Sequence, residues 1–169
     1  ATGSTTLGMG NSTTVAVSHA IGSASAAGDQ STVTFVSGSK SATATTTTNQ
    51  IYGVTISLQS TTDNGGISPG ETFNAVYTVT NTGNGADTVT IDFNADWLTG
   101  TSGTSHNLAG FGGTGTATAT LTAPGNAASD SSSSITAFAT GSGSSGDSGP
   151  MSLDVASNSR SVSLSPGAS

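Results

Sequence analysis

Small apolar side chains alternate with serine and threonine along much of this 169-residue chain, and this period of two is the feature that most limits its fold. The segment Thr114–Thr122 has the sequence Thr-Gly-Thr-Ala-Thr-Ala-Thr-Leu-Thr. Side chains of a strand point alternately to its two faces, so such a segment buries one face and exposes hydroxyls on the other. The pattern predicts antiparallel sheets with one solvated face, and no stretch has the period of a long helix.

Stretches with this alternation follow one another at short spacing, separated by turn sequences such as Asp63-Asn64-Gly65-Gly66. We therefore predict an all-β fold, an antiparallel β-sandwich of the immunoglobulin-like or jelly-roll type with about 9–10 strands. The strands are expected at Thr13–Ile21, Ser31–Ser37, Ala42–Thr48, Tyr52–Ser60, Thr72–Asn81, Asp87–Trp97, Thr114–Ala123, Ser133–Thr140, Met151–Val155 and Ser161–Ser165. Exposed loops are expected at Gly100–Gly113, Asp130–Ser134 and Gly141–Gly149.

The N-terminal segment carries its large apolar side chains at odd-numbered positions only, as one face of an extended strand does. These residues are Leu7, Met9, Val15, Val17 and Ile21. We divide the chain into an N-terminal arm, residues 1–22, and a β-sandwich domain, residues 23–169. Two interpretations of the arm stay open: it is the first strand of its own sandwich, or it is a donor strand that completes a sheet of a neighbouring copy. The segment Met151–Leu164 also alternates and competes for the donor role.

Charge is scarce, and its balance excludes several classes of partner. The chain has nine acidic residues and two basic ones, Lys40 and Arg160, for a formal net charge of −7. Nucleic acids and anionic membrane surfaces both require clusters of cations, so neither is an expected partner. No apolar run approaches the ~20 residues of a membrane-spanning helix, so membrane insertion is not expected either.

The same composition favours a secreted or cell-surface protein. Cytosolic domains are seldom so poor in lysine and glutamate, while the absence of cysteine is compatible with either compartment. Ala1 is interpreted as the residue left after removal of a signal peptide. Asn11 begins a glycosylation sequon, Asn-Ser-Thr, although a chain this rich in serine and threonine also produces such triplets by chance.

One stretch resembles a catalytic motif, but its surroundings do not support catalysis. Residues 146–150, Gly-Asp-Ser-Gly-Pro, are similar to the nucleophile motif of chymotrypsin-like proteases, yet they lack one glycine of the turn that supplies oxyanion-hole donors. Neither His19 nor His106 has the sequence surroundings of that family's histidine. We expect no enzyme activity, no catalytic residue and no required cofactor.

Calcium is the one metal that the sequence suggests. Asp92, Asn94 and Asp96 occupy alternate positions, so their oxygen ligands project from one face of a strand. Calcium loops also need a glycine turn and a later glutamate, but Trp97 stands at the glycine position and no glutamate follows. The competing interpretation is a solvated polar face opposite the buried side chains of the same strand.

The middle of the chain carries motifs of a known domain type. Residues 67–73 are Ile-Ser-Pro-Gly-Glu-Thr-Phe, and residues 77–84 are Tyr-Thr-Val-Thr-Asn-Thr-Gly-Asn. Over residues 50–141, the chain resembles immunoglobulin-like repeat domains of bacterial and archaeal cell-surface proteins. It is more loosely similar to strand-donating filament subunits, namely TasA-type biofilm fibres, archaeal bundling pili and cannula tube proteins. The resemblance implies an extracellular structural role without catalytic residues.

These observations predict a structural subunit of an extracellular filament, pilus-like fibre or tube that polymerises with copies of itself by donor-strand exchange. The expected assembly residues are Leu7, Met9, Val15, Val17 and Ile21. The alternative function is a ligand- or glycan-binding adhesin module of a larger cell-surface protein, with its ligand at loops such as Gly100–Gly113.

Overall fold

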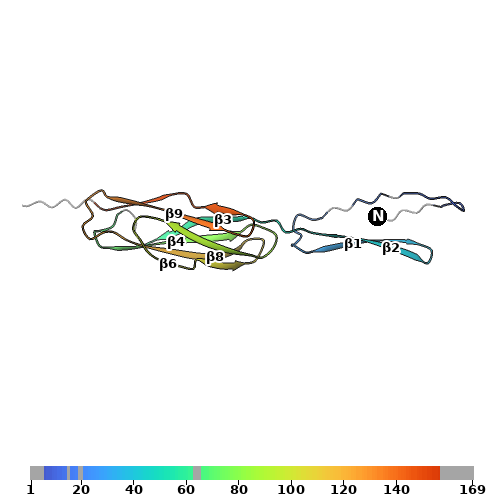
Figure 1. Ribbon diagram of the computed structural model, residues 1–169, viewed down its shortest axis with the longest axis horizontal. Coiled ribbons are helices and arrows are strands. Elements are labelled where there is room, and N and C mark those ends of the chain that lie inside the picture. The colour runs from blue at the N-terminus through green and yellow to red at the C-terminus, as the bar shows by residue number, and fades with distance from the viewer. Residues whose placement is uncertain (1–5, 15, 19–20, 63–65, 157–169) are drawn as a thin grey trace, which may run out of the picture.

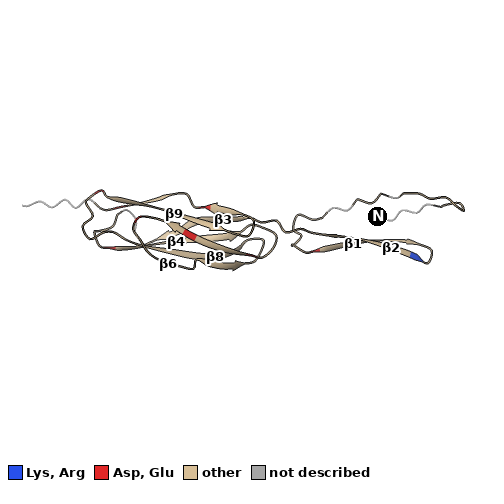
Figure 2. Cartoon of the chain, in the orientation of Figure 1, with Lys and Arg blue, Asp and Glu red and all other residues tan. Residues whose placement is uncertain are grey.

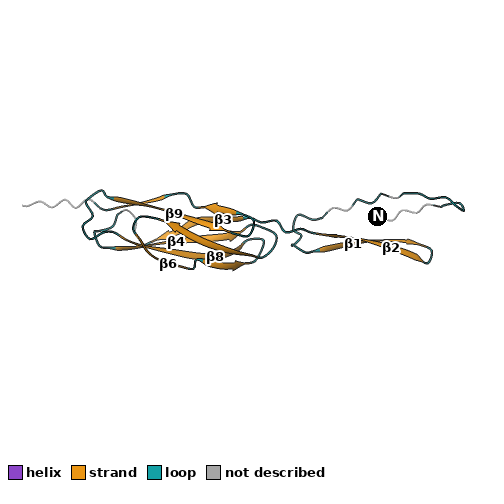
Figure 3. Cartoon of the chain, in the orientation of Figure 1, coloured by secondary structure: helices purple, strands orange, loops and turns teal. Residues whose placement is uncertain are grey.

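The computed structural model describes residues 6–14, 16–18, 21–62 and 66–156. These residues form strands, turns and loops and no helix, which confirms the all-β prediction (Figure 3). None of them therefore lies in a helix that is long and apolar enough to cross a membrane. A sandwich of two sheets occupies one end of the elongated molecule, and a two-stranded hairpin projects from it along the long axis (Figure 1).

Two antiparallel sheets make up the sandwich. The first has the strand order β3-β4-β8-β6, and the second has the order β10-β9-β5-β7, with β11 also paired to β9. The strands of the first sheet are β3 (Val54–Thr61), β4 (Thr72–Asn81), β6 (Leu98–Ser102) and β8 (Gly113–Thr122). The strands of the second are β5 (Asp87–Asn94), β7 (Ser105–Leu108), β9 (Ser132–Thr140), β10 (Ser145–Asp147) and β11 (Met151–Asp154).

Strands β10 and β11 follow one another along β9 with a bulge between them. Asp147 pairs with Phe138 and Met151 with Ile135, so three residues, 148–150, lie opposite two, 136–137. Pro150 has no N–H to donate to a strand ladder, and the preceding Gly149 has a φ of 68°. The local sequence therefore explains why this edge is divided into two short strands.

The hydrophobic core lies between the two sheets and follows the predicted alternation. On β8, Ala117, Ala119 and Leu121 are buried, while the intervening threonines face outward. The largest fully buried side chains are Tyr77, Phe73, Ile67, Ile91, Leu121 and Ile135. No residue before Val54 belongs to this core cluster, so the sandwich closes its core without the N-terminal third of the described chain.

Two strands predicted as part of the sandwich belong instead to a separate hairpin. Strands β1 (Gln30–Ser37) and β2 (Lys40–Thr47) pair with each other in a sheet of their own. Their alternation is real, but both of their outer edges stay unpaired within the described residues, because neither joins β3 or any other strand. An alternating sequence predicts a strand and does not identify its sheet.

Other differences concern short strands and the arm. Strands β7 and β10 form in segments expected to be loops, β6 runs into the first of these segments, and β9 begins inside another. The expected strand Thr13–Ile21 does not form in its described residues, 13–14, 16–18 and 21. The expected strand Ser161–Ser165 lies outside the described residues.

The Tyr77 phenol is buried at the centre of the core. Its ring contacts that of Phe93, with centroids 5.6 Å apart. Burial raises the pKa of Tyr77 above its usual value, and the neighbouring Ser148 hydroxyl offsets part of that rise. No hydrogen bond of ordinary geometry reaches the phenol among the described residues. Ser148 Oγ instead donates to Gly149 O and accepts from Ala137 N, at 2.8 and 3.1 Å.

Tyr77→Phe is expected to change the free energy of unfolding at neutral pH by less than about 1 kcal/mol, because no hydrogen bond of ordinary geometry is lost with the hydroxyl. The pKa of Tyr77 is higher in the folded state than in the unfolded state, where it is about 10. The resulting contribution to the free energy of unfolding is complete below that unfolded pKa and is lost as the pH rises through the folded-state pKa. The variant should therefore resist alkaline unfolding better than the parent. Urea titrations between about pH 8 and 11 test this. Tyr52 is exposed, so Tyr52→Phe is the control, and this variant should lose as much stability at alkaline pH as the parent does. Equal alkaline losses in parent and Tyr77→Phe would contradict the assignment.

Candidate functional site

A buried asparagine, Asn84, in the turn between β4 and β5 makes most of the hydrogen bonds between the sandwich and the base of the hairpin, and Gln50 Nε2 adds one to Ala86 O at 3.0 Å. Asn84 Oδ1 accepts from Ile51 N at 2.7 Å, and Asn84 Nδ2 donates to Asn49 O at 3.0 Å and to Ser25 O at 3.3 Å. Its backbone also participates, because Ala27 N donates to Asn84 O at 3.0 Å. Asn84 thus binds the chain on both sides of the hairpin and fixes its base to the sandwich.

A second asparagine, Asn81 at the end of β4, serves the sandwich itself. Asn81 is 1% exposed, and its Nδ2 donates to Gly85 O at 2.9 Å and Leu108 O at 3.2 Å. Its Oδ1 accepts from Gly83 N at 2.9 Å. The Asn-Thr-Gly-Asn sequence therefore supplies two different anchors, one within the sandwich and one for the hairpin.

The described arm residues lie outside the sandwich with exposed apolar side chains. Leu7 and Val17 are each 49% exposed, Ile21 is 44% exposed and Met9 is fully exposed. A turn at Gly8–Asn11, closed by Asn11 N donating to Gly8 O at 3.1 Å, contains Met9 and separates Leu7 from Val17 and Ile21. Asn11 is exposed, as a glycosylated residue must be, and Val15 lies outside the described residues. Their assembly and glycosylation roles stay predictions.

The hairpin has one apolar face and one hydroxyl face. The pairing places Val33 opposite Ala44 and Phe35 opposite Ala42, with Lys40 on the same face at the tip. The other face consists mainly of threonines, and it also carries Val36, which is 72% exposed. The arm passes beside this hairpin (Figure 1).

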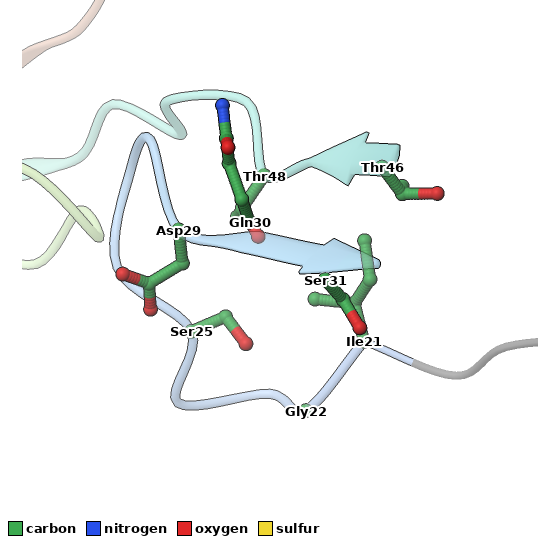
Figure 4. Close-up of a pocket in the computed structure, with 8 residues that line it drawn as sticks. All are labelled: Ile21, Gly22, Ser25, Asp29, Gln30, Ser31, Thr46 and Thr48. Atoms are coloured by element: carbon green, nitrogen blue, oxygen red, sulfur yellow. The ribbon is translucent and has the colours of Figure 1, made fainter. Parts of the chain in front are cut away.

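A hollow of about 360 Å³ lies at the base of the hairpin, where the arm meets β1 and β2 (Figure 4). Ile21 from the arm and Ser31 from β1 both line this hollow. Asp29 is the single acidic residue of the lining, and its carboxylate accepts from Ala26 N at 2.8 Å. The rest of the lining is hydroxyl, amide and backbone, so the hollow offers no nucleophile with an adjacent base.

The protease-like motif and the described histidine do not come together. Ser148 lies in the bulge between β10 and β11, whereas His106 lies on β7 at the opposite edge of the same sheet. Strands β9 and β5 separate them, and His106 Nε2 makes a 2.9 Å hydrogen bond with Thr116 O. A serine and a histidine that act together must lie within hydrogen-bonding distance, so this pair has no such geometry. His19 lies outside the described residues.

The candidate calcium ligands are exposed but do not form a closed shell. Asp92 and Asn94 project from the outer face of β5, and Asp96 follows in the next turn. No group of three or more histidine, cysteine, aspartate or glutamate residues positioned for a metal occurs in the described part of the chain. The set Asp92, Asn94 and Asp96 therefore stays a prediction, in which an amide and water would have to complete the coordination.

Strand register brings together a row that the sequence does not reveal. Phe138 on β9 lies directly opposite Asp92 on β5 and, across its other edge, opposite Asp147 on β10. Directly opposed residues present their side chains on the same face, and all three are exposed. Phe138 is 41% exposed. The row could only be found once the pairing partners of β9 were known, because the three residues lie far apart along the chain.

Comparison with known families identified one matching model, described as the VWA7 Ig-like domain, over residues 56–157. The match covers more than half of the 169 residues and spans most of β3 through β11. It leaves out the arm and the hairpin. Searches of curated proteins and of solved structures gave no match.

Proposed function

The chain belongs to the VWA7 Ig-like domain family, and from that premise we propose that it is a structural module of an extracellular assembly. The immunoglobulin-like form of the predicted sandwich is confirmed, and the likeness to bacterial and archaeal filament subunits stays part of the proposal. In this proposal the sandwich is a rigid body, and the arm and hairpin join it to copies of itself in a filament, fibre or tube. Catalysis plays no part.

The observation that carries the proposal is a set of apolar side chains that the fold does not use. Met9, Val36, Leu7, Val17, Ile21 and Phe35 are exposed, and all of them precede the first core residue, Val54. These residues are concentrated in the arm and the hairpin, and exposed apolar side chains gathered in one part of a protein mark interaction surfaces. The residues are supplied in an extended arm and a hairpin, both of which suit strand addition.

The hairpin also lacks the features that normally prevent strand addition. A two-stranded hairpin alone is marginally stable in water, and edge strands are usually protected by charges, proline or bulges. Strands β1 and β2 contain neither proline nor acidic residues, and Lys40 is their one charged residue. Their backbone edges are therefore available for pairing with a further strand.

Deleting residues 1–22 is expected to abolish polymerisation while leaving the sandwich folded, because no core residue lies before Val54. Electron microscopy of the full-length protein and the truncated protein provides the test, with light scattering to measure mass in solution. Two sets of substitutions in an arm of unchanged length test whether its apolar side chains are what assembly requires. Replacing Leu7, Met9, Val17 and Ile21 by serine should block assembly, while replacing Thr6, Ser12, Thr14 and Ser18 by alanine should not.

Fibres of normal length from the truncated protein would overturn donor-strand exchange through the arm. A full-length protein that stays monomeric at all concentrations tested would instead favour the adhesin alternative. Detection of the protein in the medium or on the cell surface, rather than inside cells, tests the extracellular location.

A further inference from the structure

We propose that the row Asp92–Phe138–Asp147 on the outer face of the second sheet receives Lys40 from the hairpin tip of a second copy. This inference rests on the proposed self-assembly and assigns its partner surface. The row places an exposed aromatic ring between two carboxylates on three adjacent strands. Neighbouring strands lie about 4.8 Å apart, so the two aspartate backbones are about 10 Å apart with the ring between them.

This arrangement has the chemistry of a receptor for a single cation. A lysine ammonium over an aromatic face is attracted by the ring's negative face, and flanking carboxylates add charge-assisted hydrogen bonds. One oxygen of Asp147 already accepts from Gly149 N at 3.0 Å, which holds this carboxylate in place and leaves its other oxygen available. Asp92 is exposed on the strand at the other side of the ring.

Charge distribution identifies the occupant as another copy. Among the described residues Lys40 is the one lysine or arginine, and it stands at the free tip of the hairpin, away from the sandwich (Figure 2). Its ammonium has no ion-pair partner in the described part of the chain. Apart from Asp29 at the hairpin base, the described acidic residues lie in the sandwich. The hairpin projects away from its own sandwich, so Lys40 reaches the row only on a neighbour.

The hairpin face that carries Lys40 also carries apolar side chains. Val33, Phe35, Ala42 and Ala44 share this face, so docking Lys40 brings the exposed Phe35 toward the neighbour's sandwich. Burial of that apolar face stabilises the contact between the two copies, and the Lys40 ammonium fixes the position of the hairpin on the neighbour's sheet. The copies are then related head to tail, which is the relation that builds a filament.

Zero-length carbodiimide cross-linking of the assembled full-length protein tests the proposal, because it joins an amine to a carboxylate in contact. Mixing isotopically light and heavy protein distinguishes links between copies from links within one. The expected product joins Lys40 of one copy to Asp92 or Asp147 of another. Assembly in which Lys40 is linked to Glu71, Asp130 or Asp154 instead, or is not linked at all, overturns this inference and leaves the proposed function standing.

Charge-reversal variants give a second, independent measurement. Lys40→Glu should raise the concentration needed for assembly by about tenfold or more, whereas Lys40→Arg should not. Combining Lys40→Glu with Asp92→Lys and Asp147→Lys should restore assembly. Asp154→Lys is the matched control, since Asp154 is also exposed but lies outside the row. Phe138→Leu should weaken assembly and Phe138→Tyr should preserve it.

The other outcomes show whether the Lys40 contact alone, or self-assembly as a whole, is wrong. Unchanged assembly of Lys40→Glu overturns this inference alone. Loss of assembly in Arg160→Glu but not in Lys40→Glu makes Arg160, and not Lys40, the cation that assembly requires, which also overturns it. A parent protein that never assembles overturns the proposed function together with this inference.

Discussion

Asn81→Ala is expected to lower the free energy of unfolding of the sandwich by about 2–4 kcal/mol, because it leaves buried groups without partners. The carbonyls of Gly85 and Leu108 and the N–H of Gly83 each lose a hydrogen bond to this side chain. The side chain is 1% exposed, so bulk water does not replace these hydrogen bonds and the cost is that of unsatisfied polar groups. Urea unfolding followed by fluorescence of Trp97, the single tryptophan, measures the shift in midpoint at constant slope.

Asn84→Ala is the matched control in the same turn. Its side chain binds Ile51, Asn49 and Ser25, all of which precede the core. The sandwich should therefore keep its stability to within about 1 kcal/mol, while hydrogen exchange accelerates over residues 25–51. Equal losses of sandwich stability in the two variants would show that the turn acts as one unit and not as two separate anchors.

The sequence was sufficient to predict the sandwich because burial there follows the period of two. Phe73, Ala75, Tyr77 and Val79 are buried at alternate positions of β4, as their spacing predicts. Such a run fixes which face of a strand is inside, since a shift of one residue would expose every apolar side chain. The turn sequences then limit the strands to an antiparallel arrangement.

The short strands could not be predicted, because they are too short to show this alternation. Strands β6, β7 and β10 have five, four and three residues and contain few apolar side chains, so tertiary pairing determines them more than sequence pattern does. In strand β2 the sequence pattern is clear, but it does not predict burial. It alternates regularly, but all of its residues are exposed because it has no second layer to pack on.

The candidate site depends on register, which a single sequence does not give. The arm residues are recognisable by their odd-numbered spacing, whereas the row at Phe138 is defined by two different neighbours of β9. In the sequence, Asp92 is a candidate calcium ligand because Asn94 and Asp96 lie nearby. In the sheet, its directly opposed neighbour is an aromatic ring, which favours an organic cation at the same carboxylate.

Gly83→Ala is expected to lower the free energy of unfolding by about 3 kcal/mol or more, because the fold leaves no room for a side chain at this position. A Cβ there would overlap the Ile51 carbonyl oxygen and lie 3.2 Å from Gly53 N. Both obstacles are backbone, which cannot rotate away. Relief would require breaking the bonds from Asn84 N to Ile51 O and from Thr82 N to Gly53 O, at 3.1 and 2.8 Å.

Those two bonds hold the start of β3 against the turn that anchors the hairpin, so the strain should reach both parts of the molecule. Chemical unfolding should show a lower midpoint, and hydrogen exchange should rise across residues 49–54. Gly125→Ala is the matched control, because a Cβ there meets no atom within 4 Å and its backbone is not in the left-handed region. That change should be neutral or stabilising by about 0.4–1 kcal/mol through the unfolded state. Comparable midpoints for the two variants would mean that the close approach at Gly83 does not limit stability.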